Sequence, residues 1–214
     1  MGTTTDTTKV PASRSLTVVL SGGVLPLPLL KEVEEITTAF KGVGVYLTTI
    51  QNLRLTGIAE ADLAEVRARL AKAGADLKGP GRYPKPKVCT GAVSCNLGLV
   101  DTLALCDRIW SLFKDRTGFK PKLKVAIAAC PASCSNATLA DIGAVATRQG
   151  FDLYVGGKGG TRPQVGRRVL RGIDEDALVA AIVRLIEYHQ EKTGQKQRMR
   201  KLIDEADFPF PAAE

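Results

Sequence analysis

Four of the five cysteines form two short pairs whose spacing suits metal chemistry. The first pair is Cys89-Thr-Gly-Ala-Val-Ser-Cys95, and the second is Cys130-Pro-Ala-Ser-Cys134. Four thiolates can hold a [4Fe–4S] cluster, because each of its irons takes one cysteine. Glycine and small residues between the ligands let the backbone wrap closely around the metal. The pattern therefore predicts an iron–sulfur cluster that serves a redox reaction.

Two other uses of these cysteines compete with a cluster. Structural zinc sites usually space paired ligands by two to four residues, so the C-x5-C pair fits zinc poorly, although a four-thiolate zinc site stays an alternative. A cysteine nucleophile generally needs a histidine partner. The only histidine, His189, falls on the predicted last helix and is interpreted as a surface or packing residue.

The fifth cysteine, Cys106, has a different setting. Together with Leu103, Ile109, Trp110 and Phe113 it fits one apolar face of a helix. Cys106 is therefore predicted to be a small hydrophobic residue of the core and not a ligand.

The composition bounds the class of protein. The chain has 214 residues, of which 44% are hydrophobic, and this allows one domain or two small ones. No run approaches the roughly 18–20 apolar residues of a membrane span, and the Thr- and Ser-rich beginning lacks the apolar segment of a signal peptide. Five cysteines are too few for a disulfide scaffold. We therefore expect a cytoplasmic protein without a membrane segment.

The formal net charge of +8 predicts an anionic partner or ligand. Nucleic acid is disfavoured, because aromatic residues make up only 5% of the chain and no nucleic-acid motif is present. A polycarboxylate cofactor or a small anionic substrate explains the same excess of charge.

The first half of the chain reads as alternating strands and helices. Apolar and β-branched runs, helical spacing and glycine stops predict these elements: a strand at 15–20, a helix at 29–40 with Leu30, Val33, Ile36 and Phe40 on one face, one or two strands at 43–55, and a helix at 59–73. This order predicts an α+β layer in which helices cover a sheet.

A Gly-, Pro- and charge-rich stretch at 79–87 is the best domain boundary. Beyond it we expect helices at 101–114 and 174–190, the second capped by Asp174, and strands at 122–129 and 151–155. The predicted division is a disordered leader (1–14), a first domain (15–78), a linker (79–87), a second domain (88–194) and a C-terminal tail (195–214).

The cysteine pattern resembles that of the sirohaem-binding nitrite and sulfite reductases, in which C-x5-C and C-x3-C ligate a [4Fe–4S] cluster. Further matches cover roughly residues 15–210: Lys122-Leu123-Lys124, Asp141-Ile142-Gly143, the loop Gly156-Gly157-Lys158-Gly159-Gly160, and upstream Gly22-Gly23-Val24-Leu25 and Leu47-Thr48-Thr49-Ile50-Gln51-Asn52. The resemblance implies a ferredoxin-like half domain followed by a [4Fe–4S] and sirohaem domain, an α+β fold.

The resemblance also implies roles for single residues. All four paired cysteines would ligate the cluster, and Cys134 would join it to the sirohaem iron. The many carboxylates of sirohaem need charged and neutral donors; the candidates are Arg54, Lys158, Arg162, Arg167, Arg168, Thr49, Gln51, Asn52, Gly157, Gly159 and Gly160. For each charge, a solvated surface residue is the alternative.

Sulfite or nitrite would bind the open face of the sirohaem and receive electrons from a ferredoxin-like donor. Lys122 and Lys124 match the family lysines that line this anion site, and their alternation along a strand would let both face one pocket. They could equally be a solvated strand start. Arg54 is a further catalytic candidate, because family members often read T-x-R-Q where this chain has Ile50 in place of the arginine.

Larger members contain the two-domain unit twice, whereas this chain has one copy and resembles the low-molecular-weight type. A symmetric homodimer could recreate the two-fold arrangement. We expect a sulfite reductase, with nitrite reduction as the nearest alternative. A corrinoid-biosynthesis oxygenase and a non-catalytic electron-transfer protein remain open.

Overall fold

The computed structural model describes residues 14–83, 85–119, 122–194 and 197–211. The chain divides into two compact units between Lys78 and Gly79, and each unit is described by itself. The predicted leader lies outside the described residues except for Arg14. No helix in the described part of the chain has both the length and the apolar character that a membrane crossing requires.

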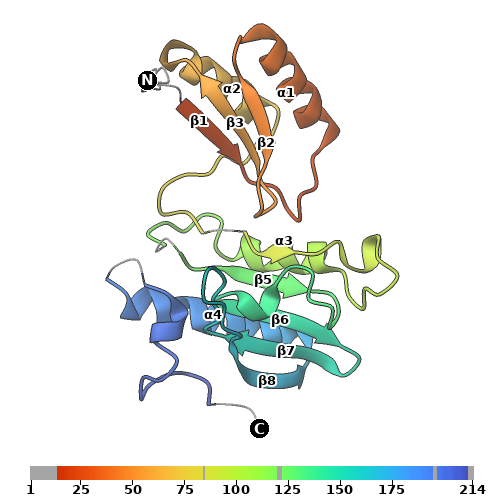
Figure 1. Ribbon diagram of the computed structural model, residues 1–214, viewed down its shortest axis with the longest axis vertical. Helices are drawn as coiled ribbons and strands as arrows, with labels where there is room; N and C mark the ends of the chain where they lie inside the picture. Colours follow the sequence, from red (N-terminus) through yellow and green to blue (C-terminus); the bar gives the residue numbers. More distant parts are fainter. Residues whose placement is uncertain (1–13, 84, 120–121, 195–196, 212–214) are drawn as a thin grey trace, which may run out of the picture. The chain divides into compact units, whose positions relative to one another are not determined.

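The first unit is a three-stranded antiparallel sheet covered by two helices (Figure 1). The elements in chain order are β1 (Arg14–Val18), α1 (Leu27–Ala39), β2 (Gly44–Leu47), β3 (Leu53–Ile58) and α2 (Leu63–Lys72). The order in the sheet is β1-β3-β2, so β3 is central and β2 is an edge. The apolar run at 43–55 thus forms two strands of a hairpin, as the second of the two sequence readings expected.

The core of this unit lies between the sheet and the helices. Leu53 and Leu55 of β3 are buried, while Arg54 between them is exposed on the other face of the sheet. On α1 the buried face contains Val33 and Ile36, as predicted. The expectation for Leu30 was wrong: Leu29 is buried instead, and Leu30 is 48% exposed.

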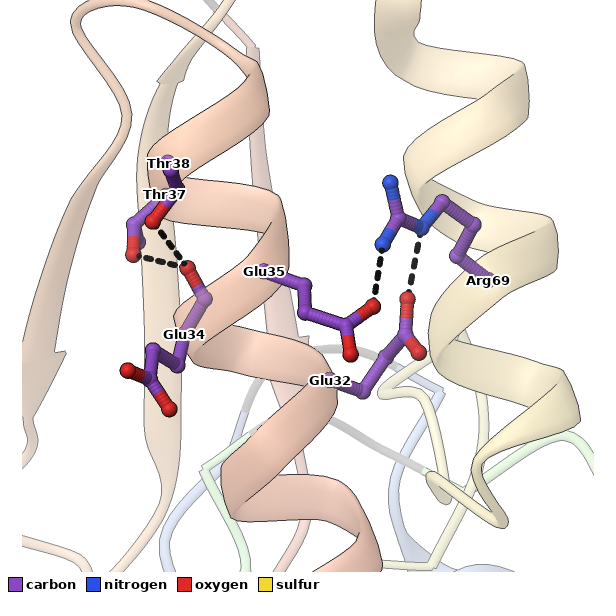
Figure 2. A network of polar contacts seen from close by, with 6 residues as sticks. All are labelled: Glu32, Glu34, Glu35, Thr37, Thr38 and Arg69. Atoms are coloured by element: carbon purple, nitrogen blue, oxygen red, sulfur yellow. Dashed lines mark hydrogen bonds and ion pairs between the residues drawn. The ribbon is translucent and has the colours of Figure 1, made fainter.

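Charged side chains join the two helices (Figure 2). The Arg69 Nε on α2 donates to Glu32 at 2.6 Å, and its Nη2 donates to Glu35 at 3.1 Å, both on α1. The hydroxyls of Thr37 and Thr38 donate back to the carbonyl of Glu34 one turn earlier. Arg69 therefore fixes the spacing of the helices that cover the sheet.

The second unit contains a five-stranded mixed sheet in the order β4-β5-β6-β7-β8 (Figure 1). Its strands are β4 (Lys87–Val88), β5 (Val125–Ala128), β6 (Ile142–Thr147), β7 (Gly150–Val155) and β8 (Arg167–Ile173). β4, β5 and β6 are parallel, and β6, β7 and β8 are antiparallel. The helices are α3 (Thr102–Ser111) and α4 (Glu175–Lys192).

The two faces of β5 have different neighbours. Val125 and Ile127 join the large core that α3 and α4 cover, whereas Ala126 and Ala128 join a small cluster around the 3-10 helix η3 (Ala137–Leu139). Both helices begin as their sequences predict, because Asp101 and Asp174 accept N-terminal amide hydrogen bonds.

Some strand expectations need correction. The expected strand at 122–129 is shorter, since Lys122 has a φ of +79° and regular pairing begins at Val125. The stretch at 79–87 was expected to be a linker, yet its last residue opens β4. β6 and β8 had no counterpart in the sequence reading.

Residues 197–211 lie against the second unit. Met199, Leu202 and Ile203 are buried in its main core. Two further contacts extend the docking: Tyr188 of α4 donates to Asp207 at 3.1 Å, and Arg167 of β8 lies over the ring of Phe208. This C-terminal segment, together with the 3-10 helix η4 (Met199–Lys201), is therefore an integral layer of the unit.

Candidate metal and cofactor site

The two cysteine motifs meet at one edge of the second sheet. Cys89 follows β4 and Cys130 follows β5, and these neighbouring strands run parallel, so both residues leave the sheet at the same end. The backbone N–H of Ala129 donates to the Cys89 Sγ at 3.2 Å. Residues separated by about 40 positions in sequence are thus brought together by strand pairing.

The loop that carries Cys95 is compact and depends on glycine. Its 3-10 helix η2 (Gly91–Val93) is continued by a hydrogen bond from the Cys95 N–H to the Gly91 carbonyl at 3.0 Å. A Cβ at Gly98 would lie 2.5 Å from backbone atoms of Gly91 and Ala92, which no side chain can tolerate. The N–H of Leu99 then donates to the Ala129 carbonyl at 2.9 Å, and this closes the loop onto the end of β5.

The second motif is built from two successive turns. The Ser133 N–H donates to the Cys130 carbonyl at 3.1 Å, and the Asn136 N–H donates to the Ser133 carbonyl at 2.7 Å. Ser133 and Asn136 both adopt left-handed backbone conformations, with φ of +50° and +58°. These turns place Cys134 at the surface, where it is exposed like Cys95.

The donor set and its tight backbone cradle fit a cluster. Among the described residues, no three His, Cys, Asp or Glu side chains converge on one point as ligands of a single ion would. A cluster does not require such convergence, because its four thiolates bind four different irons. The hydroxyls of Ser133 and Ser135, which flank Cys134, are buried without a hydrogen-bond partner in the described residues.

The remaining cysteine and the histidine are buried in the second unit. Cys106 is fully buried in the main core, as predicted. His189 is also buried, and its Nε2 lies 2.9 Å from the Gln197 carbonyl. His189 is a packing residue that links α4 to the C-terminal segment, which agrees with one of its two sequence readings.

The predicted anion-binding lysines lie at the other end of β5. Lys122 and Lys124 are exposed, and Leu123 between them is buried. They precede the strand, however, whereas Cys130 follows it. The sequence interpretation expected both lysines to line one anion pocket at the sirohaem, and within one chain the length of β5 separates them from Cys130.

The glycine-rich loop has one fixed end and one open end. Gly156 and Gly157 are buried, and a Cβ at Gly157 would lie 2.4 Å from the Ala140 carbonyl oxygen. Lys158, Gly159 and the residue after them are exposed. This loop is therefore more than a flexible connection, because its first glycines are required by close packing.

The predicted arginine donors of this unit have different settings. Arg162 is exposed in the loop after Gly160. Arg167 contacts the Ile203 carbonyl and pairs with Asp204, and Arg168 lies 3.5 Å from the carboxylate of Asp152. Arg167 and Arg168 are thus engaged in the fold of their own unit.

The half-domain candidates gather at the turn between β2 and β3. Gln51 adopts a φ of +63°, and its side chain donates to the Gly22 carbonyl at 3.4 Å. Asn52 is buried, and its side-chain oxygen accepts a hydrogen bond from the Leu20 N–H at 3.3 Å. The Asn52 side chain therefore holds the neighbouring loop. Thr49 is exposed in this turn.

Two positions bear on the arginine that the family pattern would place at residue 50. Ile50 lies at the tip of the same turn and is 47% exposed. Arg54 lies on β3, where it pairs in register with Tyr46, and its Nη2 donates to the Ser15 hydroxyl at 2.9 Å.

Asp141 is a buried carboxylate for which the sequence predicted no role. It belongs to the motif Asp141-Ile142-Gly143. It is fully buried at the start of β6 and accepts hydrogen bonds from the N–H groups of Lys124 and Met199 at 3.0 and 3.1 Å. Burial raises the pKa of Asp141 to about 6, although Arg198, which pairs with it at 2.9 Å, acts in the opposite direction. The signal in the sequence was an aspartate that opens an apolar strand.

Comparison with known proteins now identifies the family. Residues 83–209 match the model of the nitrite and sulphite reductase 4Fe-4S domain, and residues 9–73 match that of the nitrite/sulfite reductase ferredoxin-like half domain. The chain belongs to the nitrite and sulfite reductase family. The expected α+β fold, with a half domain before a [4Fe–4S] domain, is confirmed, and so are a [4Fe–4S] cluster and sirohaem as the cofactors of this family.

Named relatives include both kinds of reductase. The chain is 29% identical over 118 residues to an assimilatory-type sulfite reductase of Nitratidesulfovibrio vulgaris, a match that covers 55% of the chain and 54% of the relative. It is 30% identical over 148 residues to the large subunit of a NADH nitrite reductase of Escherichia coli, covering 67% of the chain and 17% of that subunit. The chain thus spans about half, or less, of these relatives.

Solved structures show the same fold. The NirA protein of Mycobacterium tuberculosis superposes with a TM-score of 0.73 at 20% identity, covering 88% of this chain and 37% of that one. A dissimilatory sulfite reductase I superposes with a TM-score of 0.76 at 13% identity, covering 89% and 66% of the two chains.

Proposed function

We propose that this protein reduces sulfite to sulfide at a sirohaem that is coupled to a [4Fe–4S] cluster held by Cys89, Cys95, Cys130 and Cys134. Sulfite takes up six electrons and six protons and yields sulfide and three waters. The observation that carries the proposal is the joining of the two cysteine motifs at one sheet edge by the Ala129–Cys89 hydrogen bond. The proposal places the protein in the cytoplasm, where thiols stay reduced.

The residues of this chain would bind the anion and move protons. When bound, the sirohaem and the cluster supply the iron and the electrons for this chemistry. Lys122 and Lys124 are exposed cations that can hold a small anion and donate protons as its oxygens leave as water. Arg54 is a further candidate on the half domain.

The sirohaem carboxylates need separate donors. The proposed donors of the second unit are Gly157, Lys158, Gly159, Gly160 and Arg162 of the glycine loop and its continuation. Those of the half domain are Thr49, Gln51 and Asn52. In this proposal Cys134 would be the ligand through which the cluster and the sirohaem are coupled, which its exposed position on a turn permits.

Nitrite is the second candidate substrate. Nitrite reductases are numerous among the relatives, including one of Bacillus subtilis that is 26% identical over 83% of this chain. Both anions are small, carry oxygen and accept six electrons, so one cationic site could serve either.

A ferredoxin-like protein is the proposed electron donor. A ferredoxin–nitrite reductase of Leptolyngbya laminosa is 30% identical over 109 residues. The exposure of Cys95 and Cys134 would leave the edge of a cluster within reach of a docked donor.

We further propose that two copies of the chain complete one site. Lys124 and Cys130 are six residues apart along an extended chain, which corresponds to about 20 Å at roughly 3.3 Å per residue. A lysine side chain is much shorter than this distance. In a symmetric homodimer, the lysines of each copy could line the anion site at the sirohaem of the other.

Turnover with both anions under reduced methyl viologen is the decisive experiment. Purified protein with sirohaem absorption bands, about four irons per chain and sulfide formation would support the proposal. A colourless protein that contains zinc would contradict it. A coloured protein that reduces neither anion would favour a non-catalytic electron carrier, and turnover of a corrin precursor would favour the biosynthetic oxygenase.

A further inference from the structure

Asp141 connects three segments that are distant in sequence. One carboxylate oxygen accepts from the Lys124 N–H before β5, and the other accepts from the Met199 N–H on η4. Its own carbonyl accepts from the Gly156 N–H at 2.8 Å, where the glycine loop begins. A single buried residue therefore fixes a predicted substrate lysine, the glycine loop and the C-terminal segment.

Arg198 extends this connection to the next residue of the loop. Its Nε lies 2.9 Å from the Asp141 Oδ1, and its Nη2 donates to the Gly157 carbonyl at 3.2 Å. A guanidinium group can make both contacts at once because its donors form a rigid fork. Arg198 therefore reaches the glycine loop from a side chain that Asp141 holds in place.

The position of this contact divides the loop. Gly156 and Gly157 are enclosed by η3, by the C-terminal segment and by Arg198. Lys158 pairs with Gln164 through two backbone hydrogen bonds of 2.9 and 2.7 Å, whereas nothing lies within 4 Å of a Cβ at Gly159 or Gly160. Gly159 and Gly160 are free to contact an anionic ligand. Their orientation is set by Gly156 and Gly157, which are packed in place.

We propose that Arg198, oriented by Asp141, is a positioning residue that holds the Gly156–Gly160 loop ready to bind a carboxylate of sirohaem. The inference rests on the proposed function, since it concerns the same cofactor. Arg198 acts through the Gly157 carbonyl and does not need to contact the cofactor. Its loss frees the loop while the cysteine edge stays tied by the Ala129–Cys89 hydrogen bond.

The test compares Arg198→Ala with Lys201→Ala, which removes an exposed cation of the 3-10 helix that Arg198 precedes. Sirohaem and iron are quantified per chain in the purified holoprotein, and sirohaem release is followed by its absorption after addition of a haem-binding scavenger. We expect Arg198→Ala to hold several-fold less sirohaem and release it faster, with the cluster iron close to wild type. The melting temperature should fall, because the buried Asp141 loses its ion-pair partner. Lys201→Ala should match wild type.

A conservative variant separates positioning from folding. Arg198→Lys keeps the charge but cannot span the Asp141 carboxylate and the Gly157 carbonyl together, so we expect intermediate sirohaem retention. Unchanged sirohaem in Arg198→Ala would overturn the inference alone, as would a parallel loss of sirohaem and cluster iron. A wild-type protein that takes up no sirohaem would instead overturn the proposed function and this inference with it.

Discussion

The backbone N–H of Ala129 donates a hydrogen bond to the Cys89 Sγ at 3.2 Å, across the two parallel strands that deliver the cysteine motifs. A donor in this position stabilises negative charge on the sulfur, which a metal-bound thiolate carries. Because the donor belongs to the residue before Cys130, the same contact also sets the spacing of the two motifs. The fold thus positions two of the four proposed ligands, Cys89 and Cys130, through its own backbone.

Replacing Cys89 by serine should abolish the cluster. The hydroxyl is a poor iron ligand, and we expect the iron content to fall from about four per chain to near zero, with loss of the cluster EPR signal. Cys106→Ala is the matched control, because this cysteine is buried in the core. The control should keep its iron and lose roughly 1 kcal/mol of stability. Iron loss in Cys106→Ala with retention in Cys89→Ser would refute the ligand assignment.

Gly98→Ala should impair the cluster without touching a ligand. The added methyl would lie 2.5 Å from the backbone of Gly91 and Ala92, so the Cys95 loop must shift. We expect a loss of roughly 1–3 kcal/mol in stability from this overpacking and a clearly reduced iron content. Gly194→Ala is the control, since nothing lies within 4 Å of its Cβ. Equal iron content in both variants would contradict the proposed importance of this loop.

The family's [4Fe–4S] domain and the helices were accessible from sequence because their signals are local. Two cysteine spacings indicated that domain, and Val33 and Ile36 mark the buried face of α1 by helical periodicity. Asp174 marks the start of α4 by its type alone. The error at Leu30 has a simple cause, because neighbouring leucines both fit an apolar face and only packing chooses Leu29.

Other features could not be read because their signals are not local. The strand β6 consists of small apolar residues that suit many structures, and β8 is rich in arginine, so neither shows a strand pattern. The contact between Asp141 and Met199 joins residues 58 positions apart, and no motif announces it. The separation of Lys124 from Cys130 also could not be predicted, because it depends on the length of β5, which lies between them.

The separation of lysines and cluster along β5 leads to a complementation test. We expect the Lys122→Ala/Lys124→Ala chain and the Cys134→Ala chain each to reduce sulfite at least about a hundredfold more slowly than wild type. If the lysines serve the other copy, mixing the two chains under conditions that allow exchange should restore up to about half the activity of wild type per mixed dimer. Native mass spectrometry identifies the mixed species. A dimer without restored activity, or an active monomer, would contradict shared sites.

The buried carboxylate predicts a titration close to pH 6. Burial raises the pKa of Asp141 from 3.8 to about 6, so between these values the folded protein keeps a proton that the unfolded chain has lost. The resulting stabilisation is complete below pH 3.8, falls as the pH rises to about 6, and is absent above it. Infrared difference spectra should therefore show a carboxyl band that disappears with a midpoint near pH 6.

Two variants assign this band and link it to the C-terminal segment. Asp141→Asn should abolish it, whereas Arg198→Ala should shift the midpoint upward, because the guanidinium lowers the pKa of Asp141. The fall in stability between pH 4 and 6 should likewise disappear in Asp141→Asn, measured as the melting temperature of each variant against wild type at the same pH. A midpoint near 4 would show that the neighbouring donors outweigh the burial of Asp141. A band that survives Asp141→Asn would show that it belongs to another carboxyl group.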